Sequence, residues 1–386
     1  MSETDVSGSI VEHFGGLQDP RHDRTRIHTL SNILVIAICA IICHADSWEE
    51  VEAYGLAKEA WLRTFLNLEF GIPSHDTFNR VFARLNAKKF EACFINWIIA
   101  VAQITAGQVI AFDGKLPRGS RDGSIGKGAI DIVSAWATEN QVALGQVKVN
   151  DKSNEITAIP ELLSMLELSG CIVTIDAIGC QTEIVKQIVV EKKADYAIAL
   201  KENQGRLYED VALLFADLEK SNYTAYAFEY AETFSQGHGR SETRACWTIS
   251  DPEVLKYLRG FEKWEKLRTV SRIRSYRQAG DHQSIEDRYH IASITGAKHL
   301  LAAIRSHWGI ENRLHWTLDI AFDEDQCRVR KDHGPENFAI LRHIALNLLK
   351  QEKTSKHSIK AKRLQAAWDN SYLLKVLAGF SKLVYT

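Results

Sequence analysis

Apolar residues recur at helical spacing through most of the first hundred residues of the chain. The segments with this spacing are 28–44, 48–68, 77–85 and 89–104. Turn residues separate them, and Ser74 is a suitable N-cap for a helix that begins near His75. We therefore expect residues 1–106 to form an N-terminal helical domain that binds DNA. The polar residues at 75–81 suit a helix-turn-helix, and a plain packing bundle is the alternative.

From Gln108 onward the pattern changes to short apolar runs, which are typical of buried strands. These runs are 109–113, 130–138, 142–149, 171–176 and 195–200, and helical spacing returns at 156–168 and 182–192. The resulting order, β-β-β-α-β-α-β, predicts an α/β core that begins over residues 107–205, with a mixed sheet flanked by helices.

Residues 206–296 break this rhythm with polar loops and strand-like pieces at 245–249, 267–273 and 289–293. We interpret them as an inserted, mostly β region. A long helical pattern then runs from Gly296 toward Leu318, and two more amphipathic helices are expected at 335–351 and 359–379. Residues 297–386 would thus supply the C-terminal helices of the core.

Composition is that of an ordinary globular protein, with 45% hydrophobic and 25% charged residues. The first ten residues have neither a basic nor an apolar region of the kind found in signal peptides. The longest apolar run, 33–43, is too short to cross a bilayer. Seven scattered cysteines without a CxxC pair argue for reduced thiols and against a zinc site. We expect a cytoplasmic, nucleoid-associated protein with no membrane contact.

The net charge of −2 is low for a protein that binds nucleic acid, so local charge matters more than the total. Basic residues gather in three places, and each cluster suits either DNA contact or a solvated face. The clusters are Lys115, Arg118, Arg121 and Lys127; Lys266, Arg268, Arg272, Arg274 and Arg277; and Lys353, Lys356, Lys360, Lys362 and Arg363. An acidic run at 319–325 is interpreted as a solvated turn.

Two of the predicted strands each end in an aspartate: Asp113 follows Val-Ile-Ala-Phe, and Asp176 follows Ile-Val-Thr-Ile. Ligands of α/β sheets bind outside the carboxyl ends of the strands. Two carboxylates close together there would repel each other, and a bound cation removes that penalty. Each acid alone is equally well explained as a solvated loop residue or a helix N-cap. The shared pattern favours metal ligands.

Glu311 is a third candidate ligand. One helical stripe consists of Ile304, Trp308, Glu311, His315 and Leu318. A glutamate on this stripe would face the body of the protein, whereas the alternative is an exposed ion pair with Arg305 or His307. Three carboxylates favour Mg²⁺ or Mn²⁺, and two such ions can activate a water and stabilise a leaving oxygen in phosphoryl displacement.

Four motifs occur together in the chain: Phe112-Asp113-Gly114-Lys115, the runs 152–156 and 158–163, Asp176-Ala177, and the run 307–316. At these residues the sequence resembles the H-repeat-associated transposases of bacterial insertion sequences, and the resemblance covers nearly the whole chain. It implies an RNase H-like catalytic domain, an insertion before the last catalytic residue, and a DDE triad of Asp113, Asp176 and Glu311 holding two Mg²⁺ or Mn²⁺ ions.

The resemblance also implies a transposase that binds double-stranded DNA at its terminal inverted repeats, cleaves it and joins the ends to target DNA, as a homodimer in the DNA complex. The wider group places Tyr, Arg and Lys around the glutamate, where this chain has Ile304, His307 and Leu318. Other residues must then contact DNA, and the candidates are Lys115, Arg118, Arg121, Lys201, Arg305, His307 and Arg313. The alternatives are an RNase H-like nuclease without strand transfer and a catalytically silent DNA-binding relic.

Overall fold

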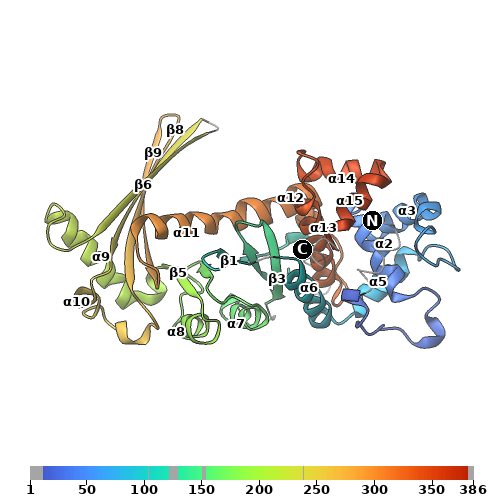
Figure 1. The fold of residues 1–386 in the computed structure, drawn as a ribbon, viewed down its shortest axis with the longest axis horizontal. Coiled ribbons are helices and arrows are strands. Elements are labelled where there is room, and N and C mark those ends of the chain that lie inside the picture. Colours follow the sequence, from blue (N-terminus) through green and yellow to red (C-terminus); the bar gives the residue numbers. More distant parts are fainter. Residues whose placement is uncertain (1–11, 103, 121–128, 150–153, 238, 381–386) are drawn as a thin grey trace.

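The computed structural model describes residues 12–102, 104–120, 129–149, 154–237 and 239–380. A mixed sheet runs through the molecule, and the helices of the N-terminal segment lie together with the last helices of the chain at one side of it (Figure 1). No helix in the described part is long and apolar enough to span a membrane.

The N-terminal segment is helical, as predicted. Its helices are α2 Leu30–Ile42, α3 Trp48–Ala57, α4 Glu59–Leu62, α5 His75–Arg84 and α6 Ala87–Val101. Ser47 and Glu50 form a capping box at the start of α3. Ser74 occupies the N-cap position of α5, but its side chain makes no capping hydrogen bond. α5 packs against α3 and α13 (Gly334–Gln351), and polar residues lie on its outer face. The helix-turn-helix interpretation of this segment stays a prediction.

The core strands confirm the expected α/β class. They are β1 Val109–Lys115, β2 Ile132–Ala137, β3 Val142–Lys148, β4 Ile172–Ile175 and β5 Asp195–Leu200. β1, β2 and β3 form antiparallel pairs, whereas β4 lies parallel to both β1 and β5. The helix α7 (Glu155–Met165) follows β3, and α8 (Thr182–Lys186) continues as a π-helix over Gln187–Glu191. The sheet is therefore mixed and flanked by helices, as predicted.

The inserted region extends this sheet. Its strands are β6 Glu229–Gly237, β7 Arg240–Ile249, β8 Thr269–Ala279 and β9 His282–Ala292. β9 pairs antiparallel with β5, which gives one nine-stranded sheet in the order β3-β2-β1-β4-β5-β9-β8-β7-β6. The region also contains a 16-residue helix, α9 (Gly205–Lys220), and a short helix, α10 (Pro252–Leu255), which the strand-like pattern did not predict. In Figure 1 the far ends of β6, β8 and β9 project beyond the helices.

The long C-terminal helix is confirmed. It comprises α11 (Ala297–Ile310), a π-helical turn over Glu311–His315 and α12 (Trp316–Phe322) without a break. The expected helix at 359–379 divides into α14 (Ile359–Trp368) and α15 (Asn370–Leu377), because Asp369 ends the first and caps the second.

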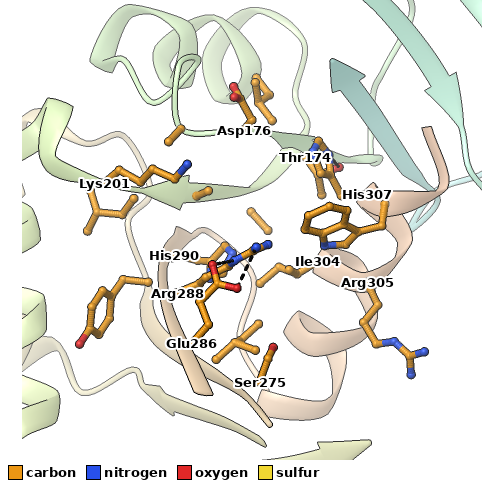
Figure 2. Close-up of a pocket in the computed structure, with 18 of the residues that line it drawn as sticks. Thr174, Asp176, Lys201, Ser275, Glu286, Arg288, His290, Ile304, Arg305 and His307 are labelled. Carbon is orange, nitrogen blue, oxygen red and sulfur yellow. Dashed lines mark hydrogen bonds and ion pairs between the residues drawn. The ribbon is translucent and has the colours of Figure 1, made fainter. Parts of the chain in front are cut away.

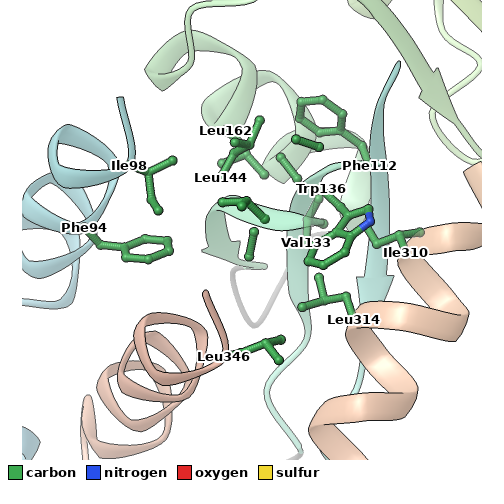
Figure 3. Packing of buried hydrophobic residues seen from close by; sticks show 14 of the residues in the cluster. Phe94, Ile98, Phe112, Val133, Trp136, Leu144, Leu162, Ile310, Leu314 and Leu346 are labelled. Atoms are coloured by element: carbon green, nitrogen blue, oxygen red, sulfur yellow. The ribbon is translucent and has the colours of Figure 1, made fainter. Parts of the chain in front are cut away.

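One apolar core joins the helical part to the sheet. Figure 3 shows Phe94 of α6, Leu346 of α13 and Trp136 of β2 in the same cluster. Each of these side chains is fully buried. Residues of β1 belong to this continuous core together with residues of the helical part. The predicted domain boundaries at 106, 205 and 296 stay predictions.

Candidate active site

The sheet topology brings the two strand-end aspartates together. Phe112 of β1 is in register with Ile175 of β4 in a parallel pair, so the residues that follow them, Asp113 and Asp176, are neighbours. Asp176 directly follows β4, whereas β1 continues through Asp113 to Lys115, so the prediction that this strand ends at Asp113 is wrong by two residues. Asp176 accepts a hydrogen bond from the backbone N–H of Ile178 (3.0 Å), which forms a tight turn after β4. The expected juxtaposition of the first two acids therefore exists.

Glu311 reaches the same place from a helix. It is the first residue of the π-helical turn after α11, and it is exposed. π-helical turns within α-helices often mark functional sites, although this chain has a second one at Gln187–Glu191. Neither alternative partner, Arg305 or His307, forms an ion pair with Glu311 in the described part of the chain. Glu311 therefore keeps its carboxylate available.

The three acids line one cleft of about 840 Å³, bounded by the ends of β4 and β5, the strands β8 and β9, and α11. Asp176 and Lys201 lie on one side of this cleft, with His307 and Ile304 across from them (Figure 2). Figure 2 also shows the ion pair between Glu286 and Arg288, which both lie on β9 and line the cleft.

Electrostatics at the acids favour a cation. Burial, together with the charges of Asp176 and Glu311, raises the pKa of Asp113 to about 7. No group of three acidic, histidine or cysteine side chains in the described ranges is close enough to hold a metal ion as the side chains stand. The donor set nevertheless fits Mg²⁺ or Mn²⁺, because all three groups are carboxylates that a hard divalent cation would relieve of mutual repulsion.

Two further acids that sequence reasoning did not identify lie beside Asp113. Glu155 begins α7, and its carboxylate fills the space above Gly114, where any Cβ would overlap it. Burial and the charges of Asp131, Asp176 and Asp113 raise the pKa of Glu155 to about 7. One carboxylate oxygen of Asp131 is buried and has no hydrogen-bond partner among the described residues. The cluster at this sheet edge is thus more acidic than the triad alone.

Two histidines of the long helix touch the site. His307 Nδ1 lies 3.1 Å from Thr174 Oγ1, and burial lowers the pKa of His307 to about 4. His315 Nδ1 lies 3.5 Å from Asp113 Oδ2, and burial lowers its pKa to about 3. Both rings are therefore neutral at pH 7, so the contact of His315 with Asp113 is a polar contact rather than an ion pair. The DNA contact of His307 stays a prediction, in which the ring is uncharged.

The amides that follow β5 hold the Asp176 loop. Asn203 donates to the carbonyl oxygen of Ala177 (2.6 Å), and Gln204 donates to that of Cys180 (2.8 Å). Lys201, a predicted DNA contact, directly precedes this segment in the chain. Lys201 projects an exposed charge at the cleft, while the amides position the loop that carries Asp176.

The predicted DNA contacts lie in very different surroundings. Lys201 and Arg305 are exposed and line the cleft, and Arg305 extends away from its centre (Figure 2). Arg313 is exposed on the next turn of the helix, outside the cleft lining. Arg118 is 87% exposed and lies 3.7 Å from Asp325, and Arg121 lies outside the described residues.

Lys115 is placed differently from the other candidates. Its Nζ lies 2.5 Å from Asp319 and 2.6 Å from Glu324, and its side chain is only 12% exposed. Glu324 is itself 3% exposed, so the interpretation of its acidic run as a solvated turn is wrong at this position. The charge of Lys115 is therefore used inside the protein.

Comparison with known families identifies the family of the chain that carries this site. Residues 105–348 match the family model described as Transposase DDE domain, and residues 11–98 match the one described as DDE_Tnp_1-associated. The chain belongs to the transposase DDE domain family. The mixed sheet flanked by helices confirms the expected α/β class, and its RNase H-like character stays a prediction.

Relatives that match this chain over nearly their full length are named as transposases. It is 41% identical over 381 residues to "Putative transposase YncI" of Escherichia coli O157:H7, which covers 97% of this chain and 96% of that protein. It is 39% identical over 375 residues to "H repeat-associated putative transposase YhhI" of Escherichia coli strain K12, which covers 96% of this chain and 98% of that protein. The resemblance to H-repeat-associated transposases is therefore confirmed.

A solved structure titled as the piggyBac transposase synaptic complex with hairpin DNA is also similar. The match has 11% sequence identity and a TM-score of 0.43, and it covers 97% of this chain and 79% of that chain.

Proposed function

We propose that this chain is an active transposase, which cleaves DNA at the ends of an insertion sequence and joins the freed 3′-OH to target DNA. The observation that carries the proposal is the meeting of Asp113, Asp176 and Glu311 at one cleft, from two parallel strands and a helix that are distant in sequence. Membership of the DDE family supports the same chemistry.

In this proposal, the three carboxylates hold two Mg²⁺ or Mn²⁺ ions. Bound there, the ions would activate the attacking hydroxyl and stabilise the leaving oxygen of the phosphodiester. Neighbouring residues of the chain position these carboxylates. Asn203 and Gln204 fix the Asp176 loop, and the neutral His315 ring lies beside Asp113 without competing with a cation for its charge.

The proposed substrate is double-stranded DNA, both at the terminal inverted repeats and at the target. Lys201 and Arg305 support it, since they are exposed cations at the cleft that holds the acids. Because two element ends have to be cut together, we propose a homodimer in the DNA complex. All seven cysteines are free, which supports action on the nucleoid in the cytoplasm.

The direct test is cleavage of a plasmid that carries the gene with its flanking DNA, incubated with the full chain and Mg²⁺. Wild type should cut at the flanking repeats, and Asp113→Ala, Asp176→Ala and Glu311→Ala should each abolish cutting. Asp217→Ala, which removes an exposed acid of α9, is the matched control and should cut normally. Equal cleavage by Asp113→Ala and wild type would refute the mechanism.

Two other results would redirect the proposal. Cleavage without joining to a second plasmid would identify a nuclease on the same fold. Binding without any cleavage by wild type would identify a silent DNA-binding relic.

A further inference from the structure

Lys350, near the C-terminal end of α13, is a half-buried lysine without an acidic partner among the described residues. Its Nζ lies 4.9 Å from the centroid of the Trp136 ring, which is fully buried, and 3.4 Å from Oε1 of Gln141. A cation–π contact and a long hydrogen bond to an amide do not neutralise an ammonium that has lost part of its hydration. The charge of Lys350 is therefore left uncompensated.

The acid nearest to Lys350 in sequence, Glu352, is already used by other groups. Its carboxylate accepts a hydrogen bond from the Tyr372 hydroxyl (2.9 Å) and lies 3.5 Å from Nζ of Lys362. Glu352 thus compensates Lys362 and does not serve as the counter-charge of Lys350.

Two further cations lie around Lys350. Arg313 of the π-helical turn and Lys353, just beyond α13, are exposed, and neither forms an ion pair within the described ranges. Burial, together with the positive charges of Arg313 and Lys353, lowers the pKa of Lys350 to about 8, so the ammonium is still largely charged at pH 7. Like charges held together cost free energy, and a bound anion would remove that cost.

The cluster of Arg313, Lys350 and Lys353 lies outside the cleft, on the other side of the long helix. Arg313 comes two residues after Glu311, and side chains two residues apart project from nearly opposite sides of a helix. Trp136, over whose ring Lys350 lies, packs against the same helix (Figure 3). An anion that reaches Glu311 and is long enough to cross the helix would therefore meet these cations.

We propose that Arg313, Lys350 and Lys353 bind a phosphate of the DNA backbone outside the cleft that holds the acids. The inference rests on the proposed function, which brings DNA to Glu311. DNA carries repeated phosphates, so one can lie at the acids while another neutralises Lys350. Contacts of this kind fix the position of the duplex and carry no sequence information.

The test measures binding of a short fluorescent duplex to the full chain in Ca²⁺ at several salt concentrations. Each phosphate contact contributes about 0.9 to the slope of the logarithm of affinity against the logarithm of salt concentration. Lys350→Met should therefore reduce the magnitude of this slope by about 1 and weaken binding roughly 8-fold at about 0.1 M salt. Lys350→Arg, which retains the charge, should keep the slope of wild type.

The stability of the free protein separates this role from a structural one. Lys350→Met removes an uncompensated charge and keeps an apolar stem, so its midpoint in urea denaturation should equal or exceed that of wild type. Lys220→Met, which removes an exposed lysine at the end of α9, is the matched control and should change neither the slope nor the midpoint.

The proposal is overturned if the slope of Lys350→Met equals that of wild type, or if its midpoint falls below that of wild type, as loss of a structural contact would cause. Absence of DNA binding by wild type would also overturn it. Failure of the proposed function is distinguishable, since it is read from plasmid cleavage by wild type and Asp113→Ala.

Discussion

Replacing Lys115 with methionine tests whether this residue stabilises the fold or contacts DNA. Its ammonium lies within ion-pair distance of Asp319 and Glu324 and 3.3 Å from the carbonyl oxygen of His315. Removing one partner of a buried ion pair leaves a buried charge uncompensated, which costs roughly 3–5 kcal/mol. Arg342 remains 3.8 Å from Glu324, so we expect the lower end, a loss of about 3 kcal/mol in the free energy of unfolding.

The pH dependence of this loss follows from Glu324. Burial alone would raise the pKa of its carboxyl, but Lys115 and Arg342 hold that pKa below its ordinary value of 4.5. A depressed carboxyl pKa adds stability that is complete above 4.5 and is lost as the pH falls through the lower, folded-state pKa. The difference between wild type and Lys115→Met should therefore be largest near pH 7 and shrink in acid.

Urea denaturation of the full chain measures both effects. Lys356→Met, which removes an exposed lysine, should change the free energy of unfolding by less than about 0.5 kcal/mol. The double variant Lys115→Met with Glu324→Gln should regain much of the loss, because it removes the unpaired charge. The reasoning is refuted if Lys115→Met is as stable as wild type and only its affinity for DNA falls.

Three further outcomes are expected. Because the pKa of Asp113 is raised to about 7, the metal-free protein should lose stability as the pH rises from 3.8 to about 7. Asp113→Asn should reduce this loss, while Glu155 keeps its own share, and it should also remove the thermal stabilisation by Mg²⁺; a pH-independent difference between the variant and wild type would contradict this. Asn203→Ala frees the Asp176 loop, so it should weaken Mn²⁺ binding in calorimetry several-fold while lowering the free energy of unfolding by only about 1 kcal/mol. An unchanged affinity for Mn²⁺ would count against this role of Asn203. Asn347→Leu should destabilise the protein by on the order of 2–5 kcal/mol in urea denaturation, because Asn347 bonds both backbone groups of Ala143 on β3; a neutral result would show that water replaces them.

The core strands could be predicted because each is an apolar run bounded by turn residues. That pattern also predicted Asp113 and Asp176 at strand ends, although β1 continues to Lys115, and only the parallel pairing of β1 with β4 makes the two aspartates neighbours. Glu155 and Asp131 could not be found in the same way. Glu155 approaches Asp113 because Gly114 leaves space for its carboxylate, which is a tertiary fact with no periodic signal.

The inserted region shows two different reasons for missing an element. α9 carries a regular stripe of buried Leu207, Val211, Leu214 and Leu218, so its signal was present among polar residues. β6, in contrast, has no periodic apolar signal in its sequence. It is the edge strand of the sheet, and its half-buried face carries only the small or polar Ala231, Thr233 and Ser235, so its sequence lacks the apolar alternation that marks a strand packed on a core.

Lys115 also explains how the first and third acids keep their spacing. Side chains two residues apart on a strand point to the same face, so Lys115 and Asp113 project from β1 toward the same neighbour, the long helix. There Lys115 binds the His315 carbonyl oxygen and Asp319, about one and two turns beyond Glu311. The ion pair therefore ties the strand of Asp113 to the helix of Glu311. From sequence, a lysine two residues after Asp113 is interpreted as a phosphate contact, but in the folded chain its charge holds β1 against the long helix.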